Sequence, residues 1–467
     1  MADVHKPYNT TYIIGITLVA TLGGLLFGYD TAVISGAEKS IQAYLIQPLG
    51  LGDFAHGVTV SSALVGCIIG GMISGFLSNR LGRKRSLLLA GLLFFTSALG
   101  SARPEFLFFV KDEPTMGLLL MFNFYRIWGG IGVGLASAVC PTYIGEIAPA
   151  EIRGRLVSCN QFAIIFGMLV VYFVNWGIAN GQTIAWINDM GWRYMFGSEA
   201  IPAGIFVTLL FFVPETPRYL VLVSQEHKAL AVLKRINATN ERAKAILGEI
   251  TSTVSETAKS KIFSFGVRVI VVGILLSVFQ QISGINVVLY FAPRIFERMN
   301  IAAARDASLF QTVIMGFVNV VFTVVAIVTV DRWGRKPLLI TGSIGMAAGM
   351  FAIAILSYFD IISMLTLVFI IIYSASFMMS WGPICWVYIS ELFPNRIRGQ
   401  AVATAVAFQW AANFLISSTF PRLMNVSGAF AYGLYGSMAV VSALFVWKMV
   451  PETKGKTLEA IEKIWKK

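Results

Sequence analysis

The stretch Tyr143-Ile-Gly-Glu-Ile-Ala-Pro-Ala-Glu-Ile-Arg-Gly-Arg155 occurs a second time in the chain, as Tyr388-Ile-Ser-Glu-Leu-Phe-Pro-Asn-Arg-Ile-Arg-Gly-Gln400. The two copies lie roughly 240 residues apart, far beyond the period of a solenoid repeat. Two further pairs recur at a similar offset and in the same order: Gly75–Lys84 with Val330–Lys336, and Pro214–Arg218 with Pro451–Gly455. This ordered set of repeated motifs predicts two halves with the same architecture and the same orientation.

The composition places both halves in lipid. Hydrophobic residues make up 57% of the chain, charged residues only 13%, and the mean hydropathy is +0.74. A soluble protein cannot bury that much apolar surface, whereas a membrane-spanning helix needs about 20 apolar residues in a row. Runs of that length predict twelve spans, at 14–35, 58–77, 86–101, 116–140, 157–178, 192–213, 267–291, 308–330, 337–358, 361–387, 401–420 and 429–450.

The distribution of basic residues sets the predicted orientation. The net charge is +12, and most of the 36 Lys and Arg residues lie in loops on the side of the membrane that carries both termini. Basic residues favour the cytoplasmic side, so we expect a cell (inner) membrane protein with both termini in the cytoplasm. Because the basic residues alternate with apolar spans, the charge is not evidence for nucleic-acid binding. The first span is too long for a removable signal peptide.

These observations predict an all-α membrane protein of twelve transmembrane helices in two pseudo-symmetric six-helix halves. We expect an N-terminal bundle at 1–215, an intracellular helical domain at 216–262, a C-terminal bundle at 263–452 and a cytoplasmic tail at 453–467. The polar segment between the halves carries apolar stripes at helical spacing, such as Ala229, Val232, Leu233 and Ile236. A disordered linker is the alternative for this segment. A twofold-repeated bundle suits alternating access to a site between its halves.

The repeated motifs resemble those of the sugar-porter branch of the major facilitator superfamily, over nearly the whole chain. Further runs that carry the resemblance are Asn160-Gln-Phe162, Phe279-Gln-Gln-Ile-Ser-Gly-Ile-Asn286, Ser380-Trp-Gly-Pro-Ile-Cys-Trp386 and Val450-Pro-Glu-Thr-Lys-Gly-Lys456. Within that branch the resemblance is greatest to the bacterial D-xylose–proton symporters, and the facilitative glucose carriers are also similar. The resemblance implies transport of a monosaccharide by a chain that works as a monomer in the lipid bilayer.

Three charged residues lie inside predicted spans, where charge is costly and usually functional. Asp30, Arg126 and Glu199 lie at similar depth in the first, fourth and sixth spans, so we expect them to meet. A carboxylate that alternates between an arginine and water can bind and release protons. The resemblance supports this role, because proton-coupled sugar porters carry Asp at the Asp30 position. The alternatives are a permanent structural pair for Asp30 and Arg126, and a supporting role for Glu199.

Polar amides and aromatic rings in the middle of spans predict a sugar site. Asn and Gln side chains donate and accept, as sugar hydroxyls do, and a buried amide without a partner costs about 1–3 kcal/mol. Hydrogen bonds between helices are the alternative use for these amides. The sugar-porter pattern assigns ligand contacts to Gln161, Gln280, Gln281, Asn286 and Gln409, and Asn319 is a further candidate. The aromatic candidates are Trp386, Phe27, Tyr290 and Trp410, with plain core or lipid packing as their alternative.

Two positions shape the predicted pocket further. Gly382, followed by Pro383, should break the tenth span and free backbone groups to line a cavity. Met168 lies two turns after Gln161 on the same face. The xylose symporters that this chain resembles carry Gln at that position, and the glucose carriers an apolar residue. Met168 therefore makes a hexose such as D-glucose a credible substrate beside D-xylose.

The repeated loop motifs predict a cytoplasmic gate. We expect salt bridges between the two halves that hold when the cavity faces out and break when it faces in. The residues expected to form them are Arg83, Glu146, Arg153, Arg335, Glu391 and Arg398. Simple retention of basic residues on the cytoplasmic side is the alternative. The first loop motif carries Asn79 where the second carries Asp331, so we expect a weaker latch in the N-terminal half.

Several other classes of protein are excluded by what the spans lack. The three histidines, His5, His56 and His227, lie outside the predicted spans, which argues against a hydrolase triad and against a metal site within the membrane. The chain has no phosphate-binding loop, and Gly129–Gly134 has the spacing of close helix packing rather than of a dinucleotide site. We expect no enzyme activity, cofactor or metal. Proton-coupled symport is the leading function, with uncoupled facilitated diffusion or a sugar sensor as alternatives.

Overall fold

The computed structural model is helical throughout the part of the chain that it describes. It describes residues 8–106, 108–110, 113–149, 152–256, 266–293, 295, 305–361, 364–393 and 398–454. Across these ranges the only strand-like pairing is an isolated bridge between Tyr8 and Asn237. The prediction of an all-α membrane protein is confirmed. Within the described ranges, eleven helices are long and apolar enough to cross a membrane, and an interrupted helix at the sixth predicted position adds a further span.

The first half of the chain forms one bundle. Its long helices are α1 (Thr10–Ile41), α2 (Asp53–Leu81), α3 (Arg83–Ala102), α4 (Met116–Ile147) and α5 (Arg153–Ala179). The sixth span is built from α6 (Ile184–Trp186), a π-helical turn at Ile187–Gly191, α7 (Trp192–Ser198) and α8 (Ala200–Leu210). A second π-helical turn, Gln42–Ile46, extends α1. Glu199 occupies the break between α7 and α8.

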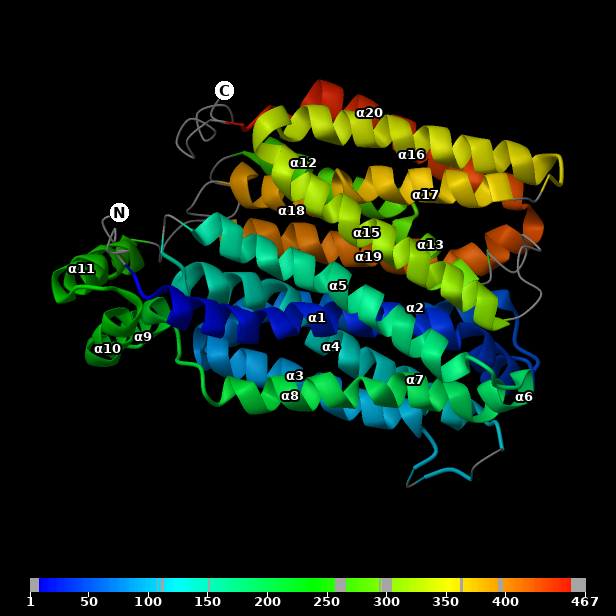
Figure 1. Ribbon diagram of the computed structural model, residues 1–467, viewed down its shortest axis with the longest axis horizontal. Helices are drawn as coiled ribbons and strands as arrows, with labels where there is room; N and C mark the ends of the chain where they lie inside the picture. The colour runs from blue at the N-terminus through cyan, green and yellow to red at the C-terminus, as the bar shows by residue number, and fades with distance from the viewer. Residues whose placement is uncertain are drawn as a thin grey trace, which may run out of the picture.

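The second half repeats the arrangement. Its helices are α12 (Val267–Ile282), α13 (Ile285–Tyr290), α15 (Arg305–Trp333), α16 (Arg335–Tyr358), α17 (Met364–Met378), α18 (Trp381–Leu392), α19 (Arg398–Val426) and α20 (Gly428–Met449). The two bundles lie side by side, with α12–α20 above α1–α8 in the view of Figure 1. Packing of α2 against α19 and of α5 against α15 joins them.

A small helical layer caps one end of the bundles. It consists of α9 (Pro217–Leu222), α10 (Glu226–Ile236) and α11 (Asn240–Glu256), which lie at the end where α1 begins (Figure 1). The backbone N–H of Asn9 donates to the carbonyl of Ile236 at 2.8 Å, which ties the start of α1 to α10. Buried Leu220, Val221 and Ala229 give this layer a small core of its own. We call this end of the molecule the α9–α11 end.

Two spans are interrupted near their middle. In the seventh span the helix stops at Ser283 and Gly284, which has a φ of +89°, before α13 begins. In the tenth span the break was predicted at Gly382 and Pro383. The structure places it earlier, at Met379 and Ser380. Pro383 falls in the first turn of α18, where its missing N–H has no helical partner to lose.

The structure corrects the sequence prediction at the start of α2. This helix begins at Asp53, five residues before the predicted span, so His56 lies within it rather than outside the spans. The His56 side chain is fully buried. The glycine run in α4 behaves as predicted: a Cβ on Gly130 would lie 1.9 Å from the backbone oxygen of Ala63 in α2, so the glycine allows close helix packing.

Candidate functional site

The charged residues of the first, fourth and sixth spans come together inside the N-terminal bundle. Nη1 of Arg126 in α4 donates to Oδ1 of Asp30 in α1 at 2.6 Å, and Nη2 donates to the Asp30 backbone oxygen at 3.2 Å. Glu199 lies close enough to interact electrostatically with both members of this pair. All three side chains are buried. The Arg126 guanidinium also lies over the ring of Phe196, at 5.1 Å.

This cluster has unused hydrogen-bonding capacity. Oδ2 of Asp30 and both carboxyl oxygens of Glu199 have no hydrogen-bond partner among the described residues. Two carboxyl groups therefore share one cation. Close like charges cannot both ionise without a large cost in a water-poor site, so the cluster is suited to hold an exchangeable proton. A purely structural pair would need only one carboxylate.

The predicted amides gather in the C-terminal bundle, around Gln280 of α12. Its Oε1 accepts a hydrogen bond from Nε2 of Gln281 at 3.3 Å and one from Nε2 of Gln409 in α19 at 2.5 Å. Asn286 of α13 donates in turn to Oε1 of Gln281 at 2.5 Å. Three helical segments thus contribute to one neutral hydrogen-bonding group of side chains, which we call the amide cluster: Gln280, Gln281, Asn286 and Gln409.

The interruption of the tenth span supplies backbone acceptors to this cluster. Nε2 of Gln280 donates to the carbonyl of Trp381 at 2.8 Å and to that of Gly382 at 3.1 Å. Both carbonyls lie in the first turn of α18, just after the break. The predicted break at Gly382 and Pro383 is not where the structure has it, because both residues lie inside α18 and the helix is interrupted at Met379 and Ser380.

Part of the hydrogen-bonding capacity around the amide cluster is open. Oε1 of Gln409, Nε1 of Trp410 and Nδ2 of Asn413 are buried without a described partner. Oδ1 of Asn413 accepts a hydrogen bond from the Ser417 hydroxyl at 3.0 Å. Sequence reasoning missed Asn413 as a site residue. Its position four residues after Gln409, on the same helix face, was the available signal. Buried polar atoms without partners mark places where a polyhydroxylated ligand gains hydrogen bonds.

The remaining predicted residues fall at different places. Gln161 of α5 is half-buried, and its side chain forms no hydrogen bond with the described residues. Met168 is buried further along the same helix, and Trp386 is half-buried in α18. Oδ1 of Asn319 accepts from Ser374 at 2.6 Å, so this amide oxygen joins α15 to α17. Phe27 contacts Trp410 across the two halves, with ring centroids 5.5 Å apart.

The repeated loop motifs form two equivalent clusters at the α9–α11 end. In the first half Arg83 pairs with Glu146 at 2.9 Å, and the Thr216 hydroxyl donates to the same carboxylate at 2.6 Å. In the second half Arg335 pairs with Glu391 at 2.9 Å, and Thr453 donates at 2.7 Å.

Two tyrosines repeat the same symmetry. Tyr143 donates to the carbonyl of Pro214, and Tyr388 donates to that of Pro451, each at 2.7 Å. The internal repeat seen in the sequence is therefore also a repeat of side-chain contacts.

Each salt bridge between two described residues lies within one half of this structure. The first turn of α3 and the last turn of α4 are neighbours, so Arg83 pairs with Glu146. The predicted bridges between the halves belong to the state in which the cavity faces out, and they stay a prediction. Arg153 donates to the backbone oxygen of Ala148, at 3.4 Å. The side chain of Arg398 lies outside the described residues.

Two glutamates hold the starts of α3 and α16. Glu215 accepts from the backbone N–H groups of Arg83 and Lys84, and Glu452 from those of Arg335 and Lys336. Burial raises the pKa of Glu215, and these amide bonds do not offset it. Burial acts the same way at Glu452, but four amide bonds outweigh it and lower the pKa of that carboxyl.

Described residues of the two halves contact each other at the end away from α9–α11. Nδ2 of Asn425 donates to Asp53 at 2.5 Å, and the rings of Trp176 and Phe310 lie 5.4 Å apart. Asp53 begins α2 and Asn425 ends α19, so this contact joins the far ends of the two bundles. The halves are therefore closed against each other at the far end.

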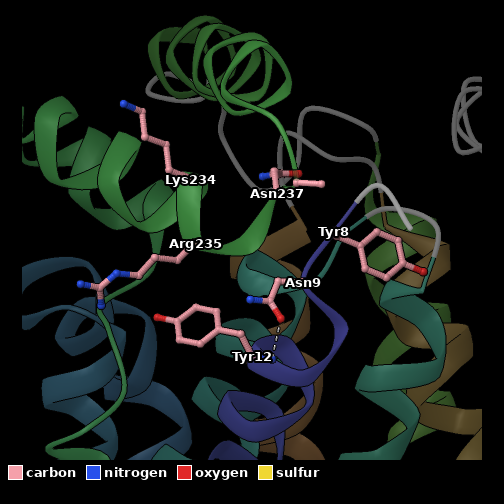
Figure 2. Close-up of a pocket in the computed structure, with 7 residues that line it drawn as sticks. Tyr8, Asn9, Tyr12, Lys234, Arg235 and Asn237 are labelled. Carbon is pink, nitrogen blue, oxygen red and sulfur yellow. Dashed lines mark hydrogen bonds between the residues drawn. The ribbon is translucent and has the colours of Figure 1, made fainter. Parts of the chain in front are cut away.

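A cavity of about 480 Å³ lies elsewhere, between the start of α1 and the end of α10. Figure 2 shows its residues, with Arg235 and Tyr12 on one side and Lys234 extending away from the others. Its lining residues are Tyr8, Asn9, Tyr12, Lys234, Arg235, Asn237 and Ala238. It contains none of the amide cluster and is not the predicted sugar site.

Comparison with known proteins gives one consistent result. The "Sugar (and other) transporter" family matches residues 16–465. The D-xylose-proton symporter of Escherichia coli (strain K12) is 50% identical, with 99% of this chain and 97% of that protein covered. The glucose facilitated diffusion protein of Zymomonas mobilis is 38% identical, with 97% of each covered. An inward-open structure of the E. coli xylose transporter matches with a TM-score of 0.87 at 50% identity, over 97% of this chain and 100% of that one.

Proposed function

This chain belongs to the sugar (and other) transporter family, and from that premise we propose that it is a proton-coupled monosaccharide symporter that works by alternating access. The observation that carries the proposal is the shared site of Asp30, Arg126 and Glu199, in which two buried carboxyls face one cation. Family membership makes the protein a transporter rather than an enzyme. The far end is closed, and the chain as a whole resembles an inward-open structure of a relative. Both observations fit the inward-facing state of an alternating-access cycle.

The proton acts at Asp30. Uptake of a proton removes the negative charge of this carboxyl and weakens its bond with Arg126, whose guanidinium then turns to Glu199 or to the Phe196 ring. Such an exchange of partners costs little, because the buried cation keeps an electron-rich neighbour in each arrangement. A change in the position of Arg126 shifts α4 relative to α1. In this way proton binding biases the relative position of helices that line the path.

The sugar binds at the amide cluster, with Gln161 and Trp386 facing it from α5 and α18. Neutral amides match neutral hydroxyls without the desolvation of a charge. The substrate class is a pentose such as D-xylose or a hexose such as D-glucose, since the relatives carry these names. Met168 adds apolar area to the N-terminal side of the site, which favours the extra carbon of a hexose ring.

The orientation and gating complete the proposal. Both termini and α9–α11 face the cytoplasm, because the basic loops are on that side. The protein lies in the cell (inner) membrane and functions as a monomer, with residues 453–467 as a cytoplasmic tail. The clusters of Arg83 with Glu146 and of Arg335 with Glu391 rigidify each half so that it moves as a body. Arg153 and Arg398 are available to bridge the halves when the cytoplasmic side closes.

Transport by purified protein in liposomes tests the function. A pH gradient, acidic outside, should drive accumulation of labelled xylose or glucose above the external concentration, and a protonophore should abolish it. Competition with a panel of pentoses and hexoses then identifies the preferred sugar. Uptake that never exceeds equilibrium would establish the alternative, uncoupled facilitated diffusion, which is the activity named for the Zymomonas relative. Binding of the sugar without any uptake would indicate a sugar sensor that does not transport.

A further inference from the structure

The cavity of about 480 Å³ between α1 and α10 has no part in the proposed transport mechanism, and its lining has a chemistry of its own. One wall is the start of α1, with Tyr8, Asn9 and Tyr12. The other wall is the last turn of α10 together with the residues that follow it. Pockets that hold small organic ligands typically measure about 300–1,000 Å³. The cavity is therefore large enough for a small metabolite or a lipid headgroup.

Backbone contacts hold the two walls of this cavity together. The backbone N–H of Asn9 donates to the carbonyl of Ile236 at 2.8 Å, and Tyr8 forms an isolated antiparallel bridge with Asn237. The Asn9 side chain also accepts from the backbone N–H of Tyr12 at 3.2 Å, and so caps the start of α1. The cavity is thus framed by hydrogen-bonded backbone, which gives it a defined shape before any ligand binds.

The lining supplies positive charge and hydrogen-bond donors. Arg235 and Lys234 form no ion pair with a described residue, and none of the described lining residues is acidic. The first turn of α1 carries no acidic residue either, so the N-terminus of this long helix adds a partial positive charge. Arg235 and Tyr12 lie on the same side of the cavity (Figure 2). A guanidinium beside a helix N-terminus suits the oxygens of a phosphate group.

The lining also contains one buried acceptor that lacks a donor. Asn237 is only 6% exposed, and its Nδ2 donates to the backbone oxygen of Leu233 at 2.9 Å, which orients the amide. Its Oδ1 has no hydrogen-bond partner among the described residues. A buried acceptor without a donor costs about 1–3 kcal/mol. An ionised phosphate oxygen cannot bond to it, because both atoms are acceptors, whereas a hydroxyl group of a ligand can.

We propose that this cavity binds a phosphate ester whose other part carries hydroxyl groups, with the phosphate at Arg235 and a hydroxyl on Oδ1 of Asn237. Basic residues in the last turn of a helix also balance its dipole, but that role leaves the cavity and the free acceptor of Asn237 unexplained. Sugar phosphates and the headgroup of phosphatidylglycerol share the required chemistry. The proposal rests on the orientation in the proposed function only for the side of the membrane from which the ligand comes.

Equilibrium binding to the full chain in detergent tests the site without any transport assay. The probes are radiolabelled glucose 6-phosphate and radiolabelled short-chain phosphatidylglycerol, with D-glucose and D-xylose in excess so that sugar at the amide cluster does not contribute. Saturable, Arg235-dependent binding of glucose 6-phosphate would assign the site to a soluble ester. Such binding of phosphatidylglycerol alone, and not of phosphatidylcholine with the same chains, would assign it to a lipid headgroup. Saturable binding of neither probe would overturn the proposal.

Two variants on α10 separate the site from a general effect of charge. Arg235→Gln should weaken binding of the probe by about tenfold or more, because it removes the charge-assisted bonds to the phosphate. Lys228→Gln is the matched control, since it removes one positive charge from an exposed position in the first turn of the same helix, outside the cavity. It should change binding less than twofold. Equal losses in the two variants would overturn the site.

A third variant tests the hydroxyl part of the ligand. Asn237→Ala removes the free acceptor, so it should weaken the ester probe by about tenfold and leave the weaker binding of inorganic phosphate unchanged. Equal effects on the ester and on inorganic phosphate would contradict the role of Asn237. The ester should also raise the melting temperature of the parent but not that of Arg235→Gln. Because sugar uptake is measured separately, a failure of proton coupling is distinguishable from a failure of this site.

Discussion

Asp30→Asn tests the proton site most directly, and the structure sets the size of its effect. The substitution removes the carboxylate that holds Nη1 of Arg126 at 2.6 Å. The bond from Nη2 to the backbone oxygen at 3.2 Å remains, because it does not involve the side chain. Removing one partner of a buried ion pair typically costs about 3–5 kcal/mol, since the other charge is left without compensation.

Glu199 changes that expectation. It lies close enough to interact with the same pair, and its oxygens have no described hydrogen-bond partner, so it can compensate Arg126 when Asp30 is gone. We therefore expect Asp30→Asn to lose clearly less stability than the full about 3–5 kcal/mol, and Glu199→Gln alone to lose little. The double variant, Asp30→Asn with Glu199→Gln, should show the full loss. The two effects are then strongly non-additive, as expected for residues that share one partner.

Thermal unfolding in detergent and sugar transport in liposomes measure the two consequences. Asp30→Asn should abolish accumulation driven by a pH gradient, yet retain exchange of labelled for unlabelled sugar across the membrane. Glu199→Gln with native Asp30 is the matched control, and should retain measurable accumulation. Concentrative uptake by Asp30→Asn would refute the coupling site. A double variant as stable as Asp30→Asn would refute the role of Glu199 as a replacement partner.

Three further predictions concern the amide cluster and the repeated loop clusters. Gln281→Ala and Asn286→Ala should each weaken sugar binding by about 1–3 kcal/mol, measured by calorimetry. Asn319→Ala, whose amide oxygen is engaged by Ser374, should affect stability more than affinity, and the reverse order would contradict the site. Thr216→Val and Thr453→Val each remove one hydroxyl bond to a partly buried glutamate and should lower stability by similar amounts, about 1 kcal/mol; a large difference would contradict the equivalence of the two clusters. The pKa of Glu452 is lowered, so its charge stabilises the fold. This stabilisation is fully present above the usual carboxyl range and is lost only as pH falls through the lowered value. The pKa of Glu215 is raised, so its charge does not stabilise the fold. Glu452→Gln should therefore reduce the melting temperature more than Glu215→Gln at pH 7, with the difference shrinking toward pH 4, and equal losses at pH 7 would contradict the assignment.

Local sequence features were sufficient for much of the architecture. The length and hydropathy of each apolar run depend only on neighbouring residues, and they located the membrane helices, although some extend well beyond the predicted bounds, as Thr10–Ile46 does beyond 14–35. The repeated motifs predicted the equivalence of the halves, which the contacts of Glu146 and Glu391 now repeat in detail. Asp30 and Arg126 could be matched because a charge within a span is rare, and because their depths agreed.

Other features depended on which helices pack together. Arg126 and Asp30 are 96 positions apart and Gln409 and Gln280 are 129 apart, so only the packing of α4 on α1 and of α19 on α12 makes them partners. The same holds for Arg83 and Arg335, whose partners in this structure, Glu146 and Glu391, lie in their own halves. The bridges predicted between the halves for the outward-facing state stay a prediction.

The pair of His56 and Glu38, whose Nε2 and Oε2 atoms lie 3.1 Å apart, shows most clearly what the sequence alone does not predict. In the sequence His56 stands two positions before the predicted apolar run that begins at residue 58, and nothing local marks it as buried. Its burial follows from the start of α2 at Asp53 and from the approach of Phe291 and α19 out of the other half. Hydropathy determined where the chain crosses the membrane. The packing of helices distant in the sequence, which no local pattern encodes, decided which of its polar side chains are withdrawn from water.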